Sequence, residues 1–198
     1  FERLAAEILA GLIDCPVGRI DEHIREALAQ VGNFLKLDGV ALRLLDETGD
    51  CTILTHRWLS DTAKPNFPIG HSLPVSETPW LFEQVRNSRT VIMQELADIP
   101  PEAKNERDIF QFEGTTSGML VPLGSAASPI GCLYIQLRQK NRQLSSADDA
   151  LLRFVGNSIS RGVERKRTEQ MLEQTIEERT RELAASLERM EEQNTVLT

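Results

Sequence analysis

Residues 117–137 read SGMLVPLGSAASPIGCLYIQL, with two apolar runs on either side of a stretch of small residues. The first run covers 119–123 and the second covers 130–137. Short apolar runs bounded by Gly, Pro and Ser are typical of strands, and the small residues at 124–129 are typical of a tight turn. This stretch therefore predicts a β-hairpin that completes a sheet.

Two helices and another hairpin are predicted upstream. Residues 4–12 carry apolar side chains at every fourth position, and helical spacing resumes over 20–35 after Pro16 interrupts it. The apolar period then becomes two, and a turn at Gly49 leads into a strand over 51–58. The first part of the chain is therefore expected to run helix, helix, strand, strand.

The middle of the chain is less regular, because four prolines between residues 65 and 79 exclude long elements. A short helix is expected over 80–86, a short strand over 90–93, and about one turn of helix over 103–110. Strand hairpins flanked by helices at both ends of the chain predict an α+β fold with a central antiparallel sheet.

The last third of the chain predicts one long helix. Ser145 or Ser146 can cap its start, and no Pro follows them. From Val163 onward there is also no Gly, Cys or aromatic residue, which is the composition of an exposed helix. We therefore expect a globular domain over 1–163 and a helical segment over 164–198.

Apolar side chains along this helix follow a heptad spacing that is typical of a parallel two-stranded coiled coil. The expected interface residues are Leu152, Val155, Ile159, Ile176, Leu183, Leu187, Met190 and Leu197. Polar side chains at Lys166, Glu169 and Glu173 weaken the middle of this series. The alternative is a single solvated helix, but a polar helix gains little stability without a partner. The sequence therefore predicts a homodimer.

Composition excludes several classes of protein. A net charge of -8, with 30 acidic against 22 basic residues, disfavours binding to nucleic acid. There is no membrane span, since no run approaches the ~20 apolar residues that one needs, and no signal peptide is recognisable. Three cysteines without CxxC spacing indicate free thiols in a reducing compartment and no metal site, so we expect a cytoplasmic protein.

An ordered set of residues resembles the closing half of a GAF domain. It comprises Gly118, Val121, Pro122, Leu123, Pro129, Ile130, Gly131, Leu133 and Tyr134, followed by Leu144, Ser146, Asp148, Leu151 and Leu152. Residues 38–45, 56–58, 79–80 and 98–103 are similar to upstream parts of GAF domains in bacterial multidomain sensors. The resemblance covers about residues 1–165.

The resemblance implies a sensory or regulatory input domain of a signal-transduction protein, with a ligand cavity under the loops on one face of the sheet. GAF domains sense cyclic nucleotides, bilins, haem, iron or metabolites, or only dimerise, so the cofactor and ligand stay unidentified. None of the three cysteines precedes a His, which disfavours a covalently bound bilin. Residues 177–182 resemble linkers that precede histidine kinase cores or, less often, diguanylate cyclase domains, which predicts such an output domain beyond Thr198.

Four residues are candidates for binding the ligand. His56 alternates with Leu54 and Trp58, so all three are expected on one face of their strand. Trp58 and Trp80 could stack on a ligand, and Tyr134 belongs to one of the two alternating sets of its strand. A packing role is the alternative for each of these residues.

Two other functions stay open at this point. One is a structural dimerisation domain with an empty cavity. The other is an enzyme, because one branch of the GAF fold reduces free methionine sulfoxide with cooperating cysteines. Cys51 and Cys132 show no redox motif, and no catalytic triad or phosphate-binding loop is recognisable. The chain itself is therefore expected to have no catalytic residues.

Overall fold

A computed structural model describes residues 2–138 and 144–196 of the chain. The chain divides into two compact units, Phe1–Gly162 and Val163–Thr198. The first unit holds a six-stranded antiparallel sheet with the strand order β3-β2-β1-β6-β5-β4. The strands are β1 (Gly39–Leu45), β2 (Cys51–Leu59), β3 (Ser72–Pro74), β4 (Val91–Met93), β5 (Ser117–Ser125) and β6 (Ser128–Leu137).

Both predicted hairpins are confirmed, since β1 pairs with β2 and β5 pairs with β6. β1 also pairs with β6, which joins the two hairpins into one sheet. The edge strand β3 was not predicted, because its three residues are too few to show a period of two. Its Pro74 is compatible with an edge position, where a missing N–H breaks no ladder.

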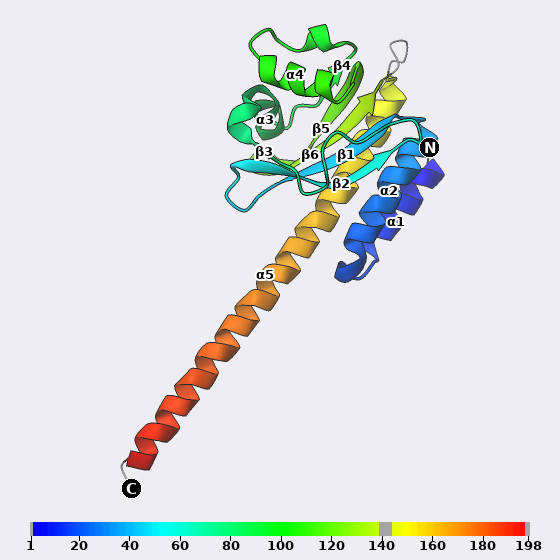
Figure 1. The fold of residues 1–198 in the computed structure, drawn as a ribbon. Coiled ribbons are helices and arrows are strands. Elements are labelled where there is room, and N and C mark those ends of the chain that lie inside the picture. The colour runs from blue at the N-terminus through cyan, green and yellow to red at the C-terminus, as the bar shows by residue number, and fades with distance from the viewer. Residues whose placement is uncertain (1, 139–143, 197–198) are drawn as a thin grey trace. The chain divides into compact units, whose positions relative to one another are not determined.

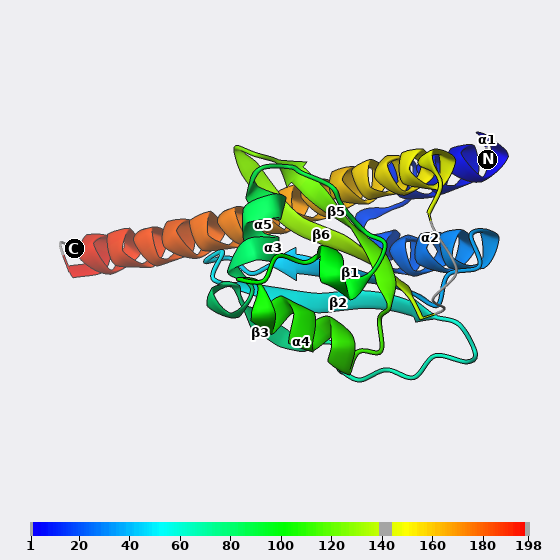
Figure 2. The same cartoon turned by 90° about the horizontal axis from the view of Figure 1, so that it is seen from above.

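Helices cover both faces of the sheet (Figures 1 and 2). The α-helices are α1 (Glu2–Ile13), α2 (Ile20–Phe34), α3 (Pro79–Arg86), α4 (Lys104–Phe112) and α5 (Ser146–Val196). α1 and α2 lie on one face with residues 146–162 of α5, whereas α3 and α4 lie on the other. Short 3₁₀ turns at Val17–Arg19, Val75–Glu77 and Leu96–Asp98 connect these elements. The predicted α+β architecture is confirmed.

The first part of α5 belongs to the core of the domain. Leu152, Val155 and Ile159 are completely buried within the same chain. At Gly156 an added Cβ would lie 3.1 Å from the Val121 side chain of β5, so helix and strand are in close contact. This corrects the expectation that these three residues face a second chain, because a heptad pattern and a core-facing helix stripe share the same spacing.

An extra residue in β2 decides which side chains face which layer. Leu42 of β1 pairs with His56, but the next residue, Arg43, pairs with Leu54. Thr55 therefore has no opposite residue in the β1 register. Such a β-bulge shifts the alternation of the strand by one. The prediction that Leu54 and His56 share a face is therefore wrong.

The second unit consists of the continuation of α5 from residue 163. Its apolar side chains Met171, Leu172, Ile176, Leu183 and Leu187 are each more than half exposed. The side chain of Met190 and the whole of Leu197 lie outside the described residues. None of the helices described in 2–138 and 144–196 has the length and apolar character needed to cross a bilayer.

Candidate functional site

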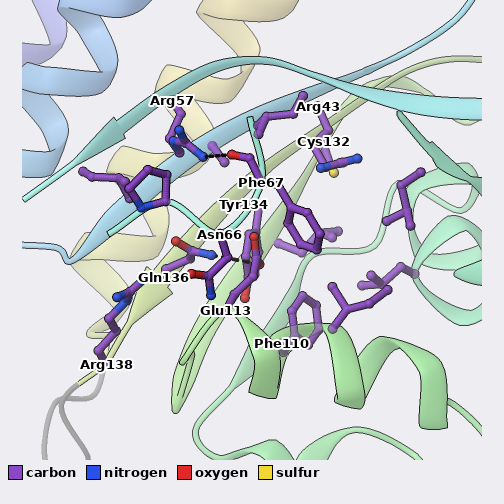
Figure 3. Close-up of a pocket in the computed structure, with 18 of the residues that line it drawn as sticks. Arg43, Arg57, Asn66, Phe67, Phe110, Glu113, Cys132, Tyr134, Gln136 and Arg138 are labelled. Atoms are coloured by element: carbon purple, nitrogen blue, oxygen red, sulfur yellow. Dashed lines mark hydrogen bonds between the residues drawn. The ribbon is translucent and has the colours of Figure 1, made fainter. Parts of the chain in front are cut away.

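A cavity lies on the sheet face that α3 and α4 cover (Figure 3). Its floor is formed by alternate residues of two central strands, Ala41 and Arg43 of β1 and Cys132, Tyr134 and Gln136 of β6. These residues pair across the ladder, Ala41 with Tyr134 and Arg43 with Cys132, so they share one face of the sheet. The cavity therefore lies over the centre of the sheet.

The cavity is small in this state. Its volume is about 50 Å³. A single water needs roughly 10–15 Å³ by the same measure, so a few waters or a few non-hydrogen atoms of a ligand fit. A larger ligand requires movement of the residues that cover the cavity.

One side of the cavity is apolar and aromatic. Phe110 of α4 stacks on Tyr134, with ring centroids 4.9 Å apart. The Tyr134 hydroxyl donates a hydrogen bond to Thr115 Oγ1 over 3.0 Å, so its polar end is satisfied although the residue is buried. Phe67 and Leu81 also line this side. It can receive the apolar part of a ligand.

The other side of the cavity is charged. Among the residues that the structure describes, four cations line it, Arg43, Arg57, Lys64 and Arg138, together with one carboxylate, that of Glu113. Arg57 reaches the cavity because Ala41, a cavity residue, is its partner in β1. Sequence reasoning missed Arg57, because a strand without a bulge would have placed it opposite Leu54.

Arg43 has a structural part in this group. Its Nε donates to Thr52 Oγ1 over 3.2 Å, and its Nη2 donates to the carbonyl oxygens of Thr52 and His71 over 3.1 and 3.2 Å. Burial lowers the pKa of its guanidinium below the ordinary value. Arg43 thus ties β1 to β2 and to the start of β3, and these bonds use three of its five N–H donors.

Residues 60–71, which we call the covering loop, connect β2 to β3 and supply Lys64, Asn66 and Phe67 to the cavity lining. Two arginines hold this loop by its backbone. Arg57 Nη1 donates to the Phe67 carbonyl over 2.6 Å, and Arg138 Nη2 donates to the Lys64 carbonyl over 3.0 Å. Asn66 Nδ2 donates to the carbonyl of Phe112 at the end of α4.

Glu113 lies at the end of α4 and accepts a hydrogen bond from Gln136 Nε2 over 2.9 Å. Burial raises the pKa of this carboxyl above its ordinary value, while the nearby cations Arg43, Arg138 and Arg57 oppose that rise. Its negative charge is therefore less favourable here than in water.

Cys132, in the floor of the cavity, is not an activated thiol. Burial raises the pKa of the Cys132 thiol to about 11, so this thiol is protonated at neutral pH and is a poor nucleophile. Within residues 2–138 and 144–196, no group of three or more His, Cys, Asp or Glu side chains could hold a metal ion.

The structure separates the four predicted ligand residues. Tyr134 lines the cavity. Trp80 packs on the apolar cluster that contains Tyr134, but it does not line the cavity, and its backbone N–H donates to Glu106 Oε1 over 2.9 Å.

His56 and Trp58 lie on the opposite face of the sheet, the one that α1 and α2 cover. His56 Nε2 is 3.5 Å from Asp21 Oδ1 of α2, and the Trp58 ring packs against Gly32 of α2. The bulge at Thr55 is the reason for this placement.

The sequence matches no protein-family model and no curated protein. Among solved structures, the phycocyanobilin-bound GAF domain from a cyanobacterial phytochrome is similar, with a TM-score of 0.70. The match covers 85% of this chain and 96% of that chain at 14% identity. This domain has the GAF fold.

GAF domains from two phosphoenolpyruvate-protein phosphotransferases are also similar. The Acinetobacter domain gives a TM-score of 0.63 at 18% identity and covers 84% of this chain and 93% of its own. The Coxiella burnetii domain gives 0.66 at 12% identity, with coverage of 85% and 95%. Similarity at these identities establishes that the chain has the GAF fold, and a fold does not specify a ligand.

Proposed function

We propose that this GAF domain is a sensory input domain that binds a small molecule in the cavity on the sheet. The observation that carries the proposal is the lining of the cavity. Buried aromatic residues such as Tyr134 and Phe110 face it from one side, and charged groups such as Arg57 face it from the other. A mostly apolar pocket with a few converging polar groups is the usual form of a small-molecule site.

The state of this site is relayed through α5. Ile176, Leu183 and Leu187 are exposed at heptad positions, and a helix that presents such a stripe to water gains stability by pairing. We propose that residues 164–198 pair in parallel with a second copy and connect the sensory domain to an output domain of a cytoplasmic protein. A histidine kinase of a two-component system is the favoured output, and a diguanylate cyclase is the alternative.

Ligand binding is tested with a variant that blocks the cavity. Ala41→Met adds volume at the cavity floor, whereas Ala150→Met adds the same side chain at an exposed position of α5. Native mass spectrometry of freshly purified protein and a thermal-shift screen of metabolites should find a compound that binds wild type and Ala150→Met. Binding should be lost in Ala41→Met.

A second candidate function is a dimerisation domain without a ligand, which the small volume of the cavity favours. The same screen decides between the two. A folded wild-type protein that carries no bound molecule and responds to no compound would overturn the sensory proposal and favour the dimerisation domain.

A further inference from the structure

The charge of the cavity differs in sign from that of the chain. The chain has a net charge of -8, yet within residues 2–138 and 144–196 four cations and one carboxylate line the cavity. With Glu113 ionised, the lining carries three positive charges in excess, four minus one. Like charges around one space repel one another unless an opposite charge offsets them, and three of these cations, Arg43, Arg57 and Arg138, are half-buried. The lining is therefore suited to an anion.

Among the three arginines, Arg57 and Arg138 have the most hydrogen-bond donors to spare for such an anion. A guanidinium carries five N–H donors. Among the residues that the structure describes, Arg57 and Arg138 each donate one side-chain hydrogen bond, to the covering loop. Arg138 Nε is buried and has no acceptor among those residues. A buried donor without an acceptor is unfavourable, and a ligand oxygen at this place would satisfy it.

The size and the apolar side of the cavity restrict the anion. Phe67, Phe110 and Leu81 offer contacts to carbon atoms and no charge. About 50 Å³ admits a few non-hydrogen atoms. Guanidinium groups match the planar carboxylate with two parallel hydrogen bonds. A carboxylate with a short apolar tail meets both sides of the cavity, whereas a phosphate ion would leave polar oxygens against the aromatic side.

We propose that the ligand of this cavity is a small organic carboxylate whose oxygens are bound by Arg57 and Arg138 and whose apolar tail lies against Phe67 and Phe110. The proposal rests on the sensory function proposed above and gives it a ligand class. Lys64 at the exposed rim adds positive charge that attracts the anion.

The test compares probes that share one tail and differ in the head group: butyrate, butyramide and butylamine, with inorganic phosphate as a fourth. Calorimetric titration of the whole chain measures each dissociation constant. Butyrate should bind at least about tenfold more tightly than butyramide, because a hydrogen bond between two charged groups is stronger than one to a neutral amide. Butylamine should not bind.

Variants identify the residues. Arg57→Gln and Arg138→Gln should each weaken butyrate binding about tenfold or more and leave butyramide almost unchanged. Arg25→Gln removes the same charge from an exposed position of α2 and should have no effect. Arg57→Lys keeps the positive charge but cannot form two parallel hydrogen bonds to a carboxylate. Its affinity for butyrate should therefore lie between those of wild type and Arg57→Gln. Melting temperatures show whether each variant is folded, and binding to a folded variant is then compared.

Each outcome decides a different claim. Butyramide binding as tightly as butyrate, or butyrate binding that both Gln variants retain, would overturn the carboxylate proposal and leave a ligand site of another class. Phosphate binding more tightly than butyrate would also overturn it. If no probe binds and Ala41→Met behaves as wild type in the metabolite screen, the sensory function itself fails.

Discussion

The ring of Trp58 in β2 lies directly on the backbone of Gly32 in α2. A Cβ added to Gly32 would come within 2.1 Å of Trp58 Cε3 and within 2.3 Å of Cζ3. Real carbon atoms do not approach so closely, so this contact exists because residue 32 has no side chain. It fixes the distance between the helix and the sheet on the face away from the cavity.

Gly32→Ala should therefore destabilise the domain. Alanine favours a helix over glycine, but the clash with Trp58 forces a shift of α2 or of the ring, which costs about 1–3 kcal/mol. Urea denaturation measures the change in the free energy of unfolding. Gly18→Ala is the matched control, because nothing lies within 4 Å of an added Cβ there. A Gly32→Ala protein as stable as wild type would contradict the contact.

The Glu113 carboxyl should make stability depend on pH. Its pKa in the folded protein is raised by burial, so the folded state holds this proton more tightly than the unfolded state. The free energy of unfolding should then fall as pH rises from the ordinary carboxyl pKa through the raised folded value. Glu113→Gln removes this loss, so the variant should gain stability relative to wild type across that range.

Urea denaturation of wild type and Glu113→Gln between about pH 4 and pH 8 follows this difference. Glu47→Gln is the matched control, since this carboxylate is exposed between β1 and β2 and is not part of the cavity lining. If the proposed anion site is correct, Glu113→Gln should also bind butyrate more tightly, because the negative charge of Glu113 is removed from the lining. A difference in stability that does not change with pH would contradict the raised pKa.

The cysteines should differ in reactivity. With a pKa of about 11, roughly one in a thousand Cys132 thiols is ionised at about pH 8. Cys51 is only half-buried. Iodoacetamide should therefore label Cys51 well before Cys132, as peptide mass spectrometry can follow over time. In urea the two rates should become similar, and equal rates in the folded protein would show that Cys132 is accessible and ionised.

Pairing of the long helix should depend on its exposed apolar positions. Ile176→Glu together with Leu183→Glu places like charges at the proposed interface and should weaken self-association about 100-fold or more. Gln174→Glu together with Ala185→Glu adds the same number of carboxylates at outer heptad positions and should leave it unchanged. Sedimentation velocity at tens of micromolar measures both. A monomeric wild type under these conditions would refute the coiled coil.

The fold could be predicted from the sequence because the strands of the centre are strongly patterned. Residues 117–137 contain nearly all of the β5–β6 hairpin, and its Tyr134, Cys132 and Gln136 alternate on the cavity side as a regular strand requires. The long helix was also plain from its composition. The sequence does not show which apolar positions of this helix are buried and which are exposed. Val155 is buried and Leu183 is exposed, although both occupy the same position of the heptad.

The site could be predicted only in part, because much of it depends on irregular structure. No local signal in the sequence marks Thr55 as the extra residue of β2, yet this residue places Arg57 in the cavity and His56 outside it. Glu113 and Lys64 reach the site from a helix end and a loop, whose positions follow from tertiary contacts. Tyr134, on a regular strand, was the one candidate of the four that lines the cavity.

The unpaired Thr55 has a mechanical consequence. Arg57 and Trp58 are neighbours in the chain and point to opposite faces of the sheet. At this point only the backbone of β2 separates the cavity from α2. Gly32 offers no side chain that could yield under the Trp58 ring. If a ligand moves Arg57, the neighbouring Trp58 moves with the strand. The Trp58 ring then displaces α2 at Gly32, so a change in the cavity reaches the helix through two adjacent residues.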